Sequence, residues 1–159
     1  MDSRISALLL YDREEPGGSL YLALEELGIL LFRIRHPEEA KEVLGRLSPP
    51  HLFFADTVLR DAPWTSAIEM ASQASQPVGV ILVSRVPDTT LYLAALECGA
   101  FDFVVPPFEQ AGLGYVVKSA HRDVMRRRSA HQPLLDIPAP IAPGVGEIMS
   151  RVRAGGVLL

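Results

Sequence analysis

Five short apolar runs, separated by amphipathic stretches, constrain the fold of this chain more than any other feature. Runs of this length suit strands that are covered on both faces of a sheet. They cover Ile5–Tyr11, Ile29–Ile34, His51–Asp56, Pro77–Ser84 and Phe101–Phe108. Strands that alternate with helices in this way are typical of a parallel sheet with helices on both faces. The sequence therefore predicts an α/β fold with five strands and five helices.

Local signals mark the ends of several of the expected helices. Pro37 suits the first turn of a helix, and the acidic residues that follow it suit the positive end of the helix dipole. Asp88 is expected to cap the helix that follows the fourth apolar run, and Gly99 is expected to end it. Cys98 falls on the face of that helix that the apolar spacing predicts to be buried.

Length and composition restrict the classes of protein to which the chain can belong. Its 159 residues suit one domain, and its formal net charge of −4 argues against a general nucleic-acid-binding domain, which usually carries a basic face. A single cysteine excludes an internal disulfide and a multi-cysteine zinc site. No apolar run approaches the length of about 20 residues that spans a membrane. We expect a cytoplasmic protein that does not bind membranes.

The character of the chain changes near its end. Four prolines and almost no charge follow His131, a composition typical of a linker. We therefore expect residues 1–128 to form the domain and residues 129–159 to form a Pro-rich linker or tail.

Polar and aromatic residues stand where several of the expected strands end. Asp12 follows the first strand, Asp56 ends the third and Ser84 ends the fourth, while Pro106 and Pro107 stop the fifth. In open parallel sheets, the working site lies beyond the carboxyl ends of the strands. These residues are therefore the first candidates for a functional site.

Three segments resemble the receiver domains of response regulators, the CheY-like fold of two-component signalling. HLFFAD resembles the third receiver strand and VILVS resembles the fourth. LAALECGAFDFVVPPF resembles the receiver segment Ala-x-x-x-Gly-Ala-x-x-[Tyr/Phe]-x-x-Lys-Pro-Phe. Ser84 and Pro106 follow Asp56 by 28 and 50 residues, as in receivers of NtrC-like regulators. The resemblance covers residues 5–128 and implies a doubly wound, flavodoxin-like sheet with the strand order 2-1-3-4-5.

The resemblance assigns roles to individual residues. It implies that Asp56 is the phosphoryl acceptor, that Ser84 supplies the signalling hydroxyl, and that Phe103 is the aromatic switch. Asp12 and Asp56 would hold Mg²⁺, with Glu14 as a weak third ligand. These residue types suit the chemistry, because a carboxylate can attack phosphorus while a hard divalent cation neutralises the developing charge.

The chain also departs from the receiver pattern at the same site. Pro106 replaces the lysine that normally pairs with the aspartyl phosphate, so a cation is missing. Tyr11 replaces the first acid of the pair that precedes the first helix. Arg13 follows Asp12 directly, and Arg85 follows Ser84, where a small residue is usual.

Two interpretations of the site follow from these departures. In one, Asp12, Asp56 and Glu14 bind Mg²⁺, and Arg13 or Arg85 contacts the phosphoryl group in place of the lysine. In the other, one of these arginines pairs directly with the carboxylates, and the domain is a pseudo-receiver with weak or absent Mg²⁺ binding. We favour the second, because loss of an acid weakens the metal site and loss of the lysine removes stabilisation of the product.

The resemblance further implies a signalling module rather than an enzyme. Its partners would be a histidine kinase or another signalling protein, with no direct contact to nucleic acid. A homodimer would form through the surface of the fourth helix, fifth strand and fifth helix, about Asp88 to Arg128. The tail resembles the linker before an output domain of NtrC-like transcription activators. A third interpretation, from another class, is an anion-binding domain that holds a nucleotide through Arg13 and Arg85.

Overall fold

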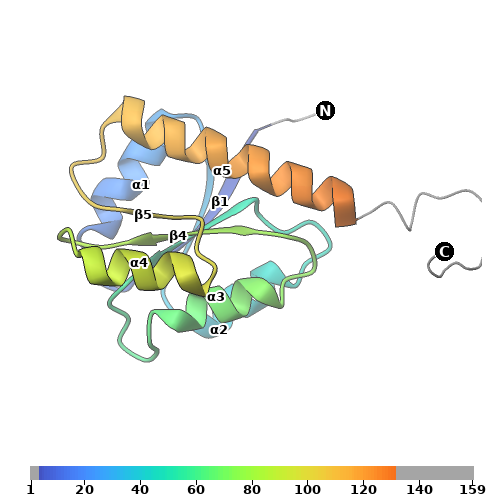
Figure 1. Cartoon of the computed structure of the whole chain (residues 1–159), viewed down its shortest axis with the longest axis horizontal. Helices are drawn as coiled ribbons and strands as arrows, with labels where there is room; N and C mark the ends of the chain where they lie inside the picture. The colour runs from blue at the N-terminus through green and yellow to red at the C-terminus, as the bar shows by residue number, and fades with distance from the viewer. Residues whose placement is uncertain (1–3, 132–159) are drawn as a thin grey trace, which may run out of the picture. The chain divides into compact units, whose positions relative to one another are not determined.

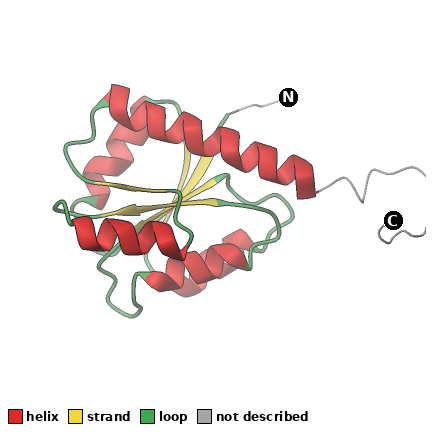
Figure 2. Ribbon diagram, viewed as in Figure 1, coloured by secondary structure: helices red, strands yellow, loops and turns green. Residues whose placement is uncertain are grey.

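The computed structural model describes residues 4–131, and these residues form a five-stranded parallel sheet in the order β2-β1-β3-β4-β5. The predicted α/β fold and strand order are confirmed (Figures 1 and 2). The strands are β1 (Ser6–Leu10), β2 (Leu30–Ile34), β3 (Leu52–Asp56), β4 (Gly79–Val83) and β5 (Asp102–Val104). The helices are α1 (Gly17–Glu26), α2 (Pro37–Leu44), α3 (Thr65–Ser72), α4 (Thr89–Cys98) and α5 (Gln110–His131). The expected tail lies almost entirely outside the described residues.

The two faces of the sheet carry separate hydrophobic clusters. Leu8, Phe53 and Leu82 pack on the face that is covered by α2, α3 and α4. Leu9 and Phe54 pack in the cluster on the other face. Figure 1 shows α1 and α5 covering that face. Alternate residues of one strand thus enter opposite clusters, which explains why the strand sequences are apolar throughout. Burial of each such leucine or phenylalanine side chain stabilises the fold by about 1.5–3 kcal/mol.

The helix signals are largely confirmed, with one correction. The Asp88 carboxylate accepts the Leu91 N–H at 3.0 Å, and Gly99 ends α4 with φ of +115°. Pro37 begins α2. The prediction for Cys98 was wrong, because its side chain is exposed. Only Ala95 of α4 is fully buried, so this helix lies on the sheet along a narrower stripe than the apolar spacing suggested.

The register of the sheet brings the candidate residues together at the carboxyl ends of the strands. Asp56 pairs with Val83, so the ends of β3 and β4 lie side by side. Leu10 of β1 pairs with Ala55, one residue before Asp56, and the loop after β1 therefore begins beside this carboxylate. Within residues 4–131, no helix combines the length and apolar character needed to cross a membrane.

Candidate functional site

Asp56 lies at the end of β3 and is almost completely buried, with 2% of its surface exposed. An arginine donates hydrogen bonds to both of its carboxylate oxygens. Arg13 donates from Nε to Oδ2 at 2.8 Å and from an Nη atom to Oδ1 at 2.9 Å. The Val58 N–H also donates to Oδ1, at 3.0 Å. A bidentate hydrogen-bonded pair of guanidinium and carboxylate is one of the strongest polar contacts in proteins.

Arg13 comes from the loop after β1 and reaches Asp56 because β1 and β3 are neighbours in the sheet. Its side chain is 30% exposed, whereas that of Asp56 is 1% exposed. The hydrogen bond to Asp56 raises the pKa of Arg13, which therefore stays charged. Of the two arginines that the sequence offered as partners for this carboxylate, the structure brings Arg13 to it.

The other two carboxylates of the expected metal site have surroundings that do not include Asp56. Asp12 accepts the backbone N–H of Arg60 at 3.0 Å, and Glu14 is exposed. Among residues 4–131, no group of three or more acidic, histidine or cysteine side chains is arranged to hold a metal ion. Because both oxygens of Asp56 accept from Arg13, the donor set does not fit a Mg²⁺ site in this arrangement.

Tyr11, at the position where receivers carry the first acid, is packed as a core side chain. It is 8% exposed, and burial raises the pKa of its phenol. The guanidinium of Arg33 lies 4.2 Å from the centre of the Tyr11 ring and donates to the Tyr11 carbonyl at 3.3 Å. On another side, a Cβ atom at Gly17 would lie 2.2 Å from this ring, so only glycine fits there. Sequence reasoning missed Arg33, although it is the one charged residue of its apolar run.

Ser84 is buried at the end of β4, and its hydroxyl points into its own loop. The hydroxyl donates to the Val86 carbonyl at 2.8 Å, and the Ser84 N–H donates to the Val104 carbonyl of β5 at 3.0 Å. The next residue, Arg85, is exposed and makes no ion pair within residues 4–131. The structure therefore does not bring Arg85 to Asp56.

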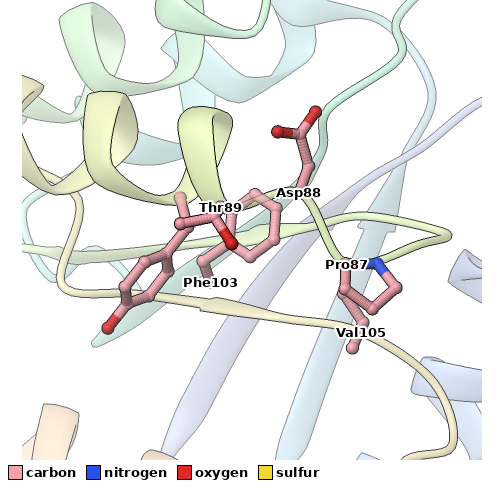
Figure 3. Close-up of a pocket in the computed structure, with 6 residues that line it drawn as sticks. Pro87, Asp88, Thr89, Phe103 and Val105 are labelled. Carbon is pink, nitrogen blue, oxygen red and sulfur yellow. The ribbon is translucent and has the colours of Figure 1, made fainter.

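Phe103, in β5, is partly buried, and its side chain lies between this strand and α4. Its ring meets that of Tyr92 edge to face, with 5.8 Å between ring centres. Both residues line a hollow of about 200 Å³, together with Pro87, Asp88, Thr89 and Val105. Figure 3 shows Phe103 reaching from the strand toward the first turn of α4. After the strand, the Pro106–Pro107 peptide bond is cis.

Known proteins support the resemblance that the sequence suggested. The chain is 26% identical over 134 residues to the response regulator protein PilR of Pseudomonas aeruginosa, covering 84% of this chain. It spans 29% of the length of that relative. No family model matches the chain.

Solved structures give the same result for the fold. NtrX from Brucella abortus, solved in complex with ADP, superposes with a TM-score of 0.70 at 19% identity, over 81% of this chain and 30% of that one. The beryllofluoride-activated NtrC4 receiver-domain dimer superposes with a TM-score of 0.63 at 22% identity, over 75% of this chain and 98% of that one.

The chain therefore has the CheY-like receiver fold of response regulators. NtrC-like regulators are among its structural neighbours, so the resemblance that the three sequence segments suggested is confirmed at the level of the fold.

Proposed function

We propose that this chain is a signal-receiving module of two-component signalling in which Arg13 holds Asp56 in place of metal and phosphate. The observation that carries the proposal is the pair of hydrogen bonds from Arg13 to both oxygens of Asp56. The receiver fold and the similarity to the response regulator PilR support the signalling role. In this proposal the domain is a pseudo-receiver that works through protein contacts in the cytoplasm.

The chemistry of phosphoryl transfer explains why this pairing matters. Asp56 would have to present a free oxygen to phosphorus, and a hard cation would have to neutralise the charge that develops there. A guanidinium on both oxygens competes with each requirement. Pro106 stands where receivers carry the lysine that pairs with the product, so an adduct at Asp56 would also lack that stabilising charge.

The surface formed by α4, β5 and α5 is proposed as the contact surface for partners and for a second copy of the chain. In these elements, Tyr92 and Leu93 of α4 and Tyr115 of α5 are 37%, 54% and 74% exposed. Aromatic side chains are enriched in protein interfaces. The NtrC4 receiver, a structural neighbour, was solved as a dimer. A histidine kinase or another signalling protein would be the upstream partner.

The receiver resemblance also leads us to propose that the segment after residue 131 connects the module to an output that controls transcription. The similarity to PilR, a response regulator of whose length the chain spans 29%, supports this proposal.

Intact mass spectrometry after incubation with acetyl phosphate and Mg²⁺ tests the proposal. We expect the folded wild-type chain and Asp56→Asn to gain no phosphoryl group. Arg85→Ala is the matched control, since its arginine makes no ion pair within residues 4–131 and should leave this result unchanged. A labile phosphoryl adduct on the wild type that is lost in Asp56→Asn would refute the pseudo-receiver and establish a conventional phospho-acceptor.

Native mass spectrometry of the same preparation tests the anion-binding alternative. A nucleotide that is bound in equimolar amount and lost in an Arg13→Ala variant would favour that alternative. A ligand-free chain that self-associates as its concentration rises would favour the interaction module.

A further inference from the structure

The outer edge of β2 carries two large apolar side chains that remain exposed. This strand lies at one edge of the sheet and, within residues 4–131, pairs with β1 alone. Its five residues are LLFRI, and two of them, Leu30 and Phe32, remain 38% and 39% exposed. Edge strands usually carry inward-pointing charges, prolines or bulges that prevent pairing with another chain.

Arg33, the one charge within this strand, does not protect the edge. Its guanidinium lies over the Tyr11 ring and donates to the Tyr11 carbonyl, so it is held on the α1 face of the sheet. Phe32 pairs with Leu8 of β1, which belongs to the cluster under α2, α3 and α4. Leu30 and Phe32 therefore share the α2 face, and α2 leaves both partly uncovered.

The direction of the backbone groups fixes which residues could pair with a second strand. The Leu30 N–H donates to the Ile5 carbonyl, and the Ile34 carbonyl accepts the Tyr11 N–H. Even-numbered residues of β2 thus point their backbone groups toward β1. Because these groups alternate along a strand, those of Leu31 and Arg33 point away from the sheet and are available at its edge.

We propose that β2 is a homotypic docking edge, at which a second copy of this chain adds its own β2 in antiparallel orientation. The full overlap of the two strands places the two-fold axis at Phe32. Leu31 of each copy then exchanges a reciprocal pair of main-chain hydrogen bonds with Arg33 of the other. The two Phe32 side chains face one another directly, and Leu30 of each copy faces Ile34 of the other.

Charge and cross-strand pairing both favour this register. A shift of the axis to Arg33 would place two arginines opposite one another, which destabilises strand pairs. In the full-overlap register, Phe32 meets Phe32 in a pair without hydrogen bonds, where side chains approach most closely. In this register Arg35, just beyond β2, lies opposite Ile29 of the other copy, near the end of α1 where Glu25 is exposed.

This edge lies at the opposite end of the strand order from β5. The docking edge is therefore independent of the α4, β5 and α5 surface proposed above, and its test does not depend on that proposal. Two copies that pair through β2 would form one continuous sheet and leave β5 of each copy accessible.

Disulfide cross-linking of the full chain tests the proposal, with the exposed native cysteine first removed by Cys98→Ser. In that background we expect Phe32→Cys to form a disulfide-linked dimer under mild oxidation, because directly opposed positions of this kind lie within disulfide reach. Leu31→Cys is the matched control. It adjoins Phe32 but would face Arg33 of the other copy, so it should stay monomeric on a non-reducing gel.

A second measurement, which does not depend on oxidation, tests the same edge. Sedimentation equilibrium of Phe32→Lys should show dimerisation weakened about tenfold or more, because the two-fold axis opposes the two new charges. Circular dichroism verifies that each variant is folded. A folded Phe32→Cys protein that stays monomeric under oxidation, or a dimer that Phe32→Lys leaves unchanged, would overturn the proposal. Cross-linking of a Leu93→Cys variant alone would assign self-association to α4 and would likewise overturn it.

Discussion

Replacing Arg13 by methionine should destabilise the domain through the carboxylate that it leaves behind. Asp56 is 2% exposed and would retain the Val58 N–H as its one remaining donor. Breaking a buried ion pair by removing one partner typically costs about 3–5 kcal/mol. Arg13 is 30% exposed, so water can enter where its side chain was and recover part of that loss. We therefore expect Arg13→Met to lower the free energy of unfolding by about 2–3 kcal/mol.

The matching change on the other side isolates the pair. Asp56→Asn removes the negative charge and leaves Arg13 partly in water, which should cost about 1–2 kcal/mol. The double variant removes both charges, so it should be more stable than the sum of the single changes predicts. We expect a coupling of about 1–2 kcal/mol between the two positions.

Urea unfolding provides the assay. The single tryptophan, Trp64, packs against the cluster beneath α2, α3 and α4 and reports on tertiary structure, while circular dichroism follows the helices. Arg60→Met is the control variant, since Arg60 is exposed and only its backbone contacts Asp12; it should change stability by less than about 0.5 kcal/mol. Strictly additive effects of Arg13→Met and Asp56→Asn would refute the reasoning, because the pair would then contribute nothing.

Three further changes test other parts of the structure. Gly17→Ala should lower the free energy of unfolding by about 1–3 kcal/mol in the same urea assay, because its Cβ would lie 2.2 Å from the Tyr11 ring; unchanged stability would contradict this packing. Burial lowers the pKa of His51 to about 4, so the unfolded chain binds a proton first as the pH falls. Stability should therefore be full above about pH 6.5 and decline toward pH 4, by about 1–2 kcal/mol after solvent screening, and His51→Gln should flatten this decline. Leu93→Asp should weaken self-association through the proposed α4, β5 and α5 surface about tenfold or more in sedimentation experiments, and an unchanged dimer would exclude that surface.

The contrast between Asp88 and Cys98 shows which parts of the fold could be predicted. Capping is a local interaction, because the Asp88 carboxylate contacts an N–H three residues later whatever the rest of the chain does. The orientation of Cys98 depends instead on how α4 lies on the sheet. An apolar helix offers several stripes that could be buried, and the contacts of α4 with β5 and α3 decide which one is.

The candidate site divides in the same way. The chain sequence alone placed Asp12, Asp56 and Ser84 at the carboxyl ends of strands, because apolar runs of strand length and the rule for parallel sheets are properties of the sequence. The resemblance to receivers implied in addition that Tyr11 and Pro106 stand in place of an acid and a lysine. The sequence offered Arg13 and Arg85 equally, since each follows a strand that neighbours β3.

Only the tertiary structure chose between these arginines. The loop after β1 turns Arg13 back over the end of β3, where both of its donors meet the buried carboxylate of Asp56. The loop after β4 turns the Ser84 hydroxyl toward Val86 and leaves Arg85 in solvent. Strands and caps follow from interactions between residues close in sequence, whereas this ion pair joins residues 43 positions apart and depends on the path of two loops. The sequence thus determined which side chains lie at the carboxyl ends of the strands. The paths of the loops determined which of these side chains contact one another.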